Sequence, residues 1–254
     1  MKESQKIPKV IHYFWFGRSP KPKLVKKCIA SWKKYCPDYE IKEWNEDNFD
    51  ITLCNYMREA YEAKKWGFVP DYARLWVVYH YGGFYLDTDV ELIKSLNSLR
   101  EKKTFFASED NHHVSIGLGF GSVKGAPILK AIYEDYNSRH FKKPDGSLDI
   151  TPSPVLQTAS IKKYYGDFEM SDTVQTIDGV VFYPKEYFCP FDCHTRKMHK
   201  TPNTIGIHHF AASWQTKRAK AKYYFVNVPK TRLYRFLVKT LGEERLKKLR
   251  RKNK

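Results

Sequence analysis

The chain has 254 residues, of which 42% are hydrophobic and 16% aromatic. This content supports a substantial core and excludes an intrinsically disordered protein. The 45 Lys and Arg residues exceed the 28 Asp and Glu residues, giving a net charge of +17. The segment 230–254 carries +9 of this charge, so the preceding 229 residues are only moderately basic.

Apolar and polar periodicities predict strands and helices that alternate along the chain. In chain order we expect a strand at 10–16, a helix from Leu24 to before Pro37, a strand at 39–44, helices at 55–65 and 71–81, strands at 84–86, 104–108 and 120–123, helices at 127–136 and from Pro152 to about Tyr165, and strands at 180–183 and 204–210. This alternation predicts an α/β fold with a mostly parallel sheet flanked by helices.

We expect one domain over 1–229, followed by a basic amphipathic tail over 230–254. The segment 1–10 is charged and lacks the apolar stretch of a leader peptide. No apolar run approaches the roughly 18 residues of a membrane span. The five cysteines favour reduced thiols in a cytosolic protein.

Two carboxylates follow the strand at 84–86. Asp71 and Arg74 share one face of the preceding helix, because they are three residues apart. Asp87 and Asp89 then leave the strand with one residue between them. Mg²⁺ and Mn²⁺ are held by one or two carboxylates together with phosphate oxygens and water. The pattern favours a metal and phosphate site, although an Asp-x-Asp triplet alone is also typical of surface turns.

Aromatic and imidazole side chains lie at the ends of two other strands. Trp15 follows the first strand, where α/β sheets bind ligands. It is placed to stack on a nucleobase, and core packing is an equally good interpretation. His208 and His209 are adjacent on a late strand, so only one of them faces a given site.

Together these segments resemble glycosyltransferase family 32, the proteins with a sugar-binding region containing a DXD motif. Members include yeast-type initiating mannosyltransferases and bacterial capsule or exopolysaccharide enzymes. More distantly the chain resembles the glucosylating domains of large clostridial toxins. The matching segments are Ile7–Gly17, Asp71–Arg74, Tyr81–Asp89, Tyr183–Pro190 and Ile207–Trp214. The resemblance implies a GT-A fold in 1–229, a divalent metal (Mn or Mg) and a retaining transfer of a hexose-type sugar from a nucleotide sugar, with UDP preferred over GDP.

The resemblance also implies roles for individual residues. The donor-binding set is Trp15, Phe16, Asp71, Arg74, Asp87, Ser213 and Trp214. The metal-binding set is Asp87, Asp89 and His209. The catalytic set contains Asp89 and Arg74. To these we add Glu109 and Asp110, which follow the next strand and would lie nearest the reacting carbon or the acceptor hydroxyl; a plain loop is at least as good an interpretation of these two. The segment Gly117–Phe120 departs from the family, because many relatives carry an asparagine before its Gly-Phe pair.

The expected partners are a nucleotide sugar and a lipid-linked glycan acceptor, with no nucleic acid. The tail has an apolar helical stripe among basic residues, which suits an anionic membrane or, alternatively, packing on the catalytic domain. We expect a cytoplasmic protein associated peripherally with the inner face of the cell membrane. Two other functions fit less well: a phosphohydrolase would need further acidic ligands for a second metal, and a nucleic-acid-binding protein would not concentrate its charge in a tail.

Overall fold

The computed structural model describes residues 6–110, 112–166, 168–192 and 197–211. The chain divides into two compact units. One consists of Met1–Phe191 and His199–Ala211; the other, Asp192–Met198 with Ala212–Lys254, contains only three described residues. The boundary predicted at residue 230 and the basic tail lie outside the described residues.

A seven-stranded sheet forms the centre of the first unit, in the order β2-β1-β3-β6-β5-β8-β7. Its strands are β1 (Val10–Phe14), β2 (Glu40–Trp44), β3 (Gly83–Tyr85), β5 (Thr104–Ala107), β6 (Phe120–Ser122), β7 (Gln175–Ile177) and β8 (Val180–Tyr183). Strand β1 pairs in parallel with β2 and β3, and β5 with β8. The remaining pairs, β3–β6, β5–β6 and β7–β8, are antiparallel. The sheet is therefore mixed: β2, β1 and β3 form one parallel part, and β5 and β8 form a second parallel pair.

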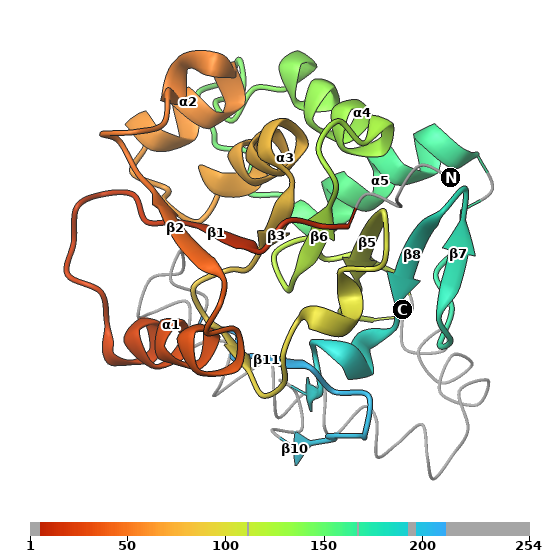
Figure 1. Ribbon diagram of the computed structural model, residues 1–254. Helices are drawn as coiled ribbons and strands as arrows, with labels where there is room; N and C mark the ends of the chain where they lie inside the picture. Colours follow the sequence, from red (N-terminus) through yellow and green to blue (C-terminus); the bar gives the residue numbers. More distant parts are fainter. Residues whose placement is uncertain (1–5, 111, 167, 193–196, 212–254) are drawn as a thin grey trace, which may run out of the picture. The chain divides into compact units, whose positions relative to one another are not determined.

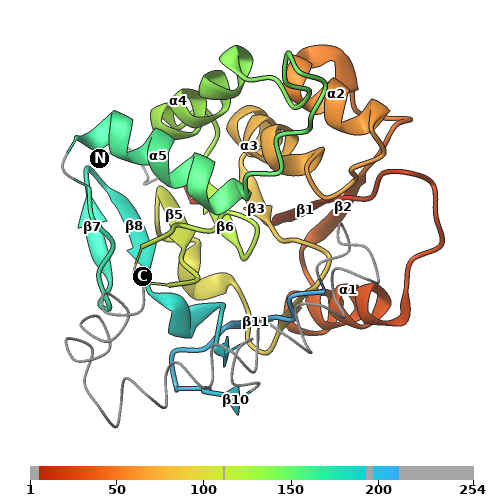
Figure 2. The same cartoon turned by 180° about the vertical axis from the view of Figure 1, so that it is seen from behind.

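Helices cover both faces of this sheet, as Figures 1 and 2 show. The helices are α1 (Lys23–Tyr35), α2 (Asn55–Glu62), α3 (Pro70–Tyr81), α4 (Pro127–Asp135) and α5 (Ser153–Tyr165). Helices α2 to α5 pack on one face over an aromatic-rich core, and α1 lies on the other face over a second core. Short 3-10 helices occur at Ile51–Leu53, Asn97–Leu99, Tyr136–Ser138 and Lys185–Tyr187. This layered arrangement confirms the predicted α/β class.

A small antiparallel sheet lies beside α1. It pairs β4 (Val90–Leu92) with β11 (Gly206–His208), and its register sets His208 opposite Val90. Two further short strands are β9 (Phe191–Asp192) and β10 (Lys197–Met198). Strands β4, β7, β9 and β10 were not predicted. Among the described helices, none is both long and apolar enough to cross a membrane.

Candidate active site

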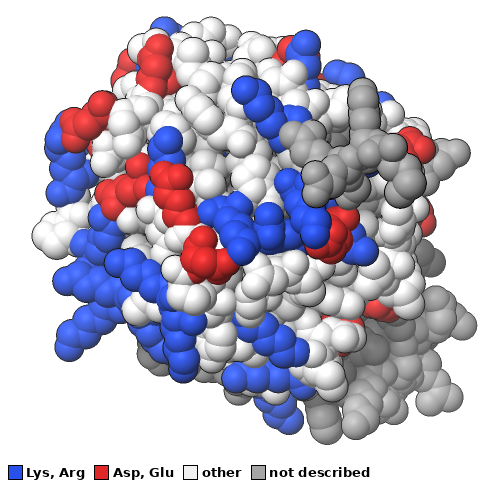
Figure 3. Space-filling model, in the orientation of Figure 1, with Lys and Arg blue, Asp and Glu red and all other residues white. Residues whose placement is uncertain are grey.

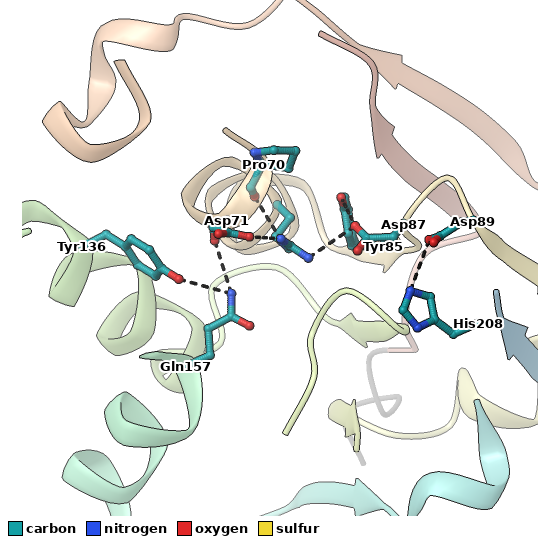
Figure 4. Close-up of polar contacts among 9 residues, drawn as sticks. Pro70, Asp71, Tyr85, Asp87, Asp89, Tyr136, Gln157 and His208 are labelled. Atoms are coloured by element: carbon teal, nitrogen blue, oxygen red, sulfur yellow. Dashed lines mark hydrogen bonds and ion pairs between the residues drawn. The ribbon is translucent and has the colours of Figure 1, made fainter. Parts of the chain in front are cut away.

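Helix α3 supplies a buried ion pair. The helix begins at Pro70, which suits a first helical position, and ends at Gly82, whose φ of 70° few other residues adopt. Asp71 and Arg74 are each only 2% exposed and form an ion pair within the first turn. Arg74 Nε also donates to the carbonyl of Pro70 at 3.1 Å. The guanidinium group is therefore fixed on its own helix by Asp71 and Pro70, both of which are labelled in Figure 4.

Arg74 reaches beyond α3 to the end of β3. Its Nη1 atom lies 3.3 Å from Oδ1 of Asp87, and its guanidinium group lies 5.3 Å from the ring centre of Tyr85. Burial raises the pKa of Asp71 to about 6, although Arg74 favours the charged carboxylate. A buried cation between two carboxylates is costly unless it is paired well. The cluster of Asp71, Arg74 and Asp87 is thus a charged site built inside the fold.

Asp87 is held from three sides. Tyr85 Oη donates to its Oδ1 at 2.7 Å, and its own backbone N–H donates to the carbonyl of Gly117 at 3.0 Å. A Cβ atom at Gly117 would lie 2.3 Å from Asp87 Oδ2 and 2.7 Å from Arg74 Nη1. The space beside this carboxylate therefore exists only because residue 117 is glycine.

Asp89 is held by the segment that follows β11. Its Oδ1 lies 3.3 Å from His208 Nε2, and its Oδ2 accepts the backbone N–H of Ala211 at 2.8 Å. Burial disfavours the carboxylate, but the charge and hydrogen bond of His208 lower the pKa of Asp89 to about 2. Asp89 is therefore ionised at neutral pH.

The structure brings His208, rather than the predicted His209, to the acidic pair. His209 Nε2 lies 2.8 Å from Oε2 of Glu91, which also binds Lys27 Nζ at 2.7 Å. The two imidazoles point to different partners because consecutive residues of an extended strand face opposite sides. Metal binding by His209 is thus not supported by its position.

The chemistry of this site fits a divalent cation. Asp87, Asp89 and His208 offer carboxylate oxygens and an imidazole, and the buried His208 Nδ1 has no hydrogen-bond partner in the described structure. The three side chains do not form a closed cage: among the described residues, only Glu109, Asp110 and His113 bring three potential ligand atoms within 4.8 Å of one another. An open set suits a cation that takes its other ligands from phosphate and water.

Two of the three predicted aromatic donor contacts lie among the described residues, and one of these two belongs to the core. Trp15 is only partly buried, and its Nε1 donates to the carbonyl of Ser19 at 2.7 Å. Phe16 is 5% exposed and stacks on Phe14 with ring centres 5.3 Å apart. The prediction of Phe16 as a donor contact is therefore corrected: its ring is packed inside the core. Ser213 and Trp214 lie outside the described residues.

The two other predicted carboxylates follow β5. Burial raises the pKa of Glu109, with His208 close enough to oppose the shift electrostatically. Asp110 accepts the backbone N–H groups of His112 and His113 and lies 3.0 Å from the Nδ1 of His113. Glu109 is thus near the Asp89–His208 pair, whereas Asp110 is engaged in its own turn.

Several site residues were not predicted. Tyr85 had a usable signal, because a strand places it on the same side as Asp87. Gly117 was named only as part of the segment Gly117–Phe120 that departs from the family, and Gln157 was not named at all. Gln157 is fully buried on α5, where its Nε2 lies 3.5 Å from the carbonyl of Asp71 and 3.4 Å from the hydroxyl of Tyr136 (Figure 4). This contact joins α5 to the ion pair of α3.

Comparison with known proteins identifies the class. Residues 22–106 match the family described as "Glycosyltransferase sugar-binding region containing DXD motif". Inositol phosphoceramide mannosyltransferase 1 of Schizosaccharomyces pombe (strain 972 / ATCC 24843) is 28% identical over 180 residues, covering 64% of this chain and 53% of that protein. Inositol phosphoceramide mannosyltransferase 3 of the same organism is 29% identical over 134 residues, covering 50% of this chain and 36% of that protein. The chain thus spans about half the length of these relatives, or less.

The fold has a counterpart among solved structures. PaToxG glycosyltransferase superposes with a TM-score of 0.52 at 17% identity, covering 63% of this chain and 71% of that one. This likeness concerns the fold alone and agrees with the GT-A type that the sequence implied. The matched region 22–106 contains both the ion pair of α3 and the two aspartates after β3. Over residues 22–106 the chain is therefore similar to the DXD-motif family of glycosyltransferases.

Proposed function

We propose that this protein transfers a hexose from a nucleotide sugar to a glycan acceptor, with a divalent metal and with retention of anomeric configuration. The observation that carries the proposal is the meeting of Arg74, Asp87, Asp89 and His208 at one end of the parallel strands. Mannose is the first sugar to test, because the similar curated proteins are named mannosyltransferases. For the base, the family resemblance favours UDP over GDP.

The residues have complementary tasks in this reaction. A leaving diphosphate gains negative charge as the anomeric bond breaks, and a preorganised cation stabilises it. Arg74 is such a cation, because Asp71 and Asp87 fix its position. Asp87, Asp89 and His208 would hold the metal, which supplies further positive charge when bound. Glu109 is the carboxyl that we assign to the neighbourhood of the acceptor hydroxyl.

The test is a screen of UDP- and GDP-linked sugars for metal-dependent thermal stabilisation and hydrolysis. A ligand at 100 times its Kd stabilises a protein by about 2.7 kcal/mol. Asp89→Asn keeps the size of the side chain, so we expect an unchanged fold and no activity. The exposed Asp172→Asn is the matched control. Full activity in Asp89→Asn, or in the wild-type protein with a chelator, would refute the proposal.

The acceptor and the location form a second part of the proposal. We assign a lipid-linked acceptor at the inner face of the cell membrane in surface polysaccharide synthesis, with the tail 230–254 binding the anionic surface. Its support is the basic composition of the tail and the lipid acceptor in the names of the curated relatives. Deleting 230–254 should weaken binding to anionic vesicles while donor hydrolysis survives. Unchanged vesicle binding after the deletion would remove the tail from the proposal.

A further inference from the structure

Helix α1 presents a face made almost entirely of lysine. Its sequence KLVKKCIASWKKY contains no acidic residue. The five lysines, hereafter the α1 lysine face, are Lys23, Lys26, Lys27, Lys33 and Lys34. All five are exposed, and their helical spacing places them on one side together with Ala30. The opposite side is buried through Val25, Cys28 and Trp32, so the orientation of the helix is fixed.

The α1 lysine face is largely unneutralised. Among the described residues, only Lys27 of the five has an acidic partner, Glu91. Some lysines elsewhere in the same unit do pair with acids, as Lys21 does with Glu43 and Lys163 with Asp135. Figure 3 shows Lys and Arg gathered at the lower left, where α1 lies in the same orientation. Four adjacent positive charges on a rigid helix therefore face the solvent.

The helix is bonded directly to the strand that follows the acidic motif. Trp32 Nε1 donates to the carbonyl of Val90 at 2.7 Å, and Ser31 Oγ accepts the backbone N–H of Leu92 at 2.9 Å. Val90 is the residue after Asp89, so two hydrogen bonds connect the buried side of α1 to the site. A surface that binds the lysine face is thereby held in a fixed relation to the site.

We propose that the α1 lysine face docks on an anionic membrane surface. It is about 20 Å long, because 13 helical residues rise about 1.5 Å each. Its exposed side chains are lysine and alanine, so it offers dense positive charge and no aromatic ring on which a nucleic-acid base could stack. Lysine near an anionic lipid surface gains about 1 kcal/mol, or about fivefold in partitioning. This contact goes beyond the proposed reaction and does not depend on it.

The experiment compares two full-length variants with equal net charge. In the first, Lys23, Lys26, Lys33 and Lys34 are replaced by Gln, which keeps helix propensity. Lys27 is retained because it binds Glu91. The control replaces four other exposed lysines that have no acidic partner among the described residues. These are Lys124, Lys142, Lys143 and Lys162. Sedimentation is measured with phosphatidylcholine vesicles, with and without phosphatidylserine, and thermal melting checks the fold.

We expect the wild-type protein and the control to bind the anionic vesicles at low salt and to ignore neutral ones. The α1 variant should bind at least about tenfold more weakly, since four lysines each contribute several-fold. The tail is present in every protein, so its contribution does not distinguish them. Equal binding by the α1 variant and the control, or no binding by the wild-type protein, overturns the proposal. Loss of binding to duplex DNA in the α1 variant, with vesicle binding intact, overturns it in favour of a nucleic-acid partner.

Discussion

His208 and Asp89 are joined through both side chain and backbone. The Nε2 atom of His208 lies 3.3 Å from Oδ1 of Asp89, and the next residue, His209, donates its backbone N–H to the carbonyl of Asp89 at 3.0 Å. Pairing of β11 with β4 sets this relationship. The second aspartate of the motif, Asp89, is therefore positioned by a strand more than one hundred residues later in the chain. Both β11 and the segment that carries Asp89 are needed to build this part of the site.

Replacing the two histidines one at a time tests which of them binds the metal. His208→Gln should weaken metal-dependent donor hydrolysis and raise the metal concentration for half-maximal activity by about 10- to 100-fold, the cost that residues around a metal commonly carry. His209→Gln removes only the contact with Glu91 at the edge of the site. Titration of activity with Mn²⁺ distinguishes them. Equal effects of the two substitutions would contradict the assignment of His208.

Gly117→Ala should impair activity with little loss of stability. The added Cβ would lie 2.3 Å from Asp87 Oδ2, so the carboxylate and Arg74 must shift. A displacement of about 1 Å at a reacting site costs about a hundredfold in rate. Gly121→Ala is the contrasting variant, because its Cβ would meet the core rings of Phe105 and Phe84 at 2.7 and 2.9 Å.

Gly117→Ala is thus expected to lower kcat and Gly121→Ala to lower Tm. The steric effect should also depend on Asp87: in an Asp87→Ala background, Gly117→Ala should change donor affinity less, because only the close approach to Arg74 remains. A drop in Tm for Gly117→Ala as large as that of Gly121→Ala would show that the glycine is structural only.

The sequence predicted the local features of this site better than its long-range ones. The pair on α3 and the aspartates after β3 follow from helical spacing and from a glycine stop, which are local patterns. The choice between His208 and His209 depends on the register of β11 against β4, which adjacent residues do not encode. Phe16 was misassigned for a related reason: the strand ends at Phe14, and tertiary packing decides which of the following rings turns inward.

Acid should destabilise the fold through His12. This residue is 1% exposed; its Nδ1 accepts from Trp44 Nε1 at 3.1 Å and its Nε2 donates to the carbonyl of Gly82 at 2.8 Å. Burial lowers the pKa of His12 from 6.5 to about 4. Between these values the unfolded chain binds the proton and the folded protein does not, so stability falls as pH falls. The loss reaches about 3 kcal/mol near pH 4.

His12→Gln should remove this part of the acid sensitivity. The Gln amide has one acceptor and one donor group, as the neutral imidazole does, and it does not titrate. Urea unfolding at pH 7 and at pH 4.5 gives the comparison: the free energy of unfolding of the wild-type protein should fall more than that of His12→Gln. Identical pH dependence in both proteins would show that His12 is protonated in the folded state without penalty.

Trp15 and Phe16 are adjacent in the chain, but substituting Trp15 should lower donor affinity, whereas substituting Phe16 should lower stability. Trp15→Ala should weaken donor binding by about 1–3 kcal/mol, the value of stacking a base on an aromatic ring, while Tm changes little because the ring is only partly buried. Phe16→Ala should cost about 3–5 kcal/mol of stability, since it empties a packed core position. Trp15→Phe keeps an aromatic face and should be mild. Donor affinity and Tm measured for all three variants separate the roles. If Trp15→Ala unfolds the protein while the folded fraction binds donor normally, then Trp15 belongs to the core, and the base must bind elsewhere.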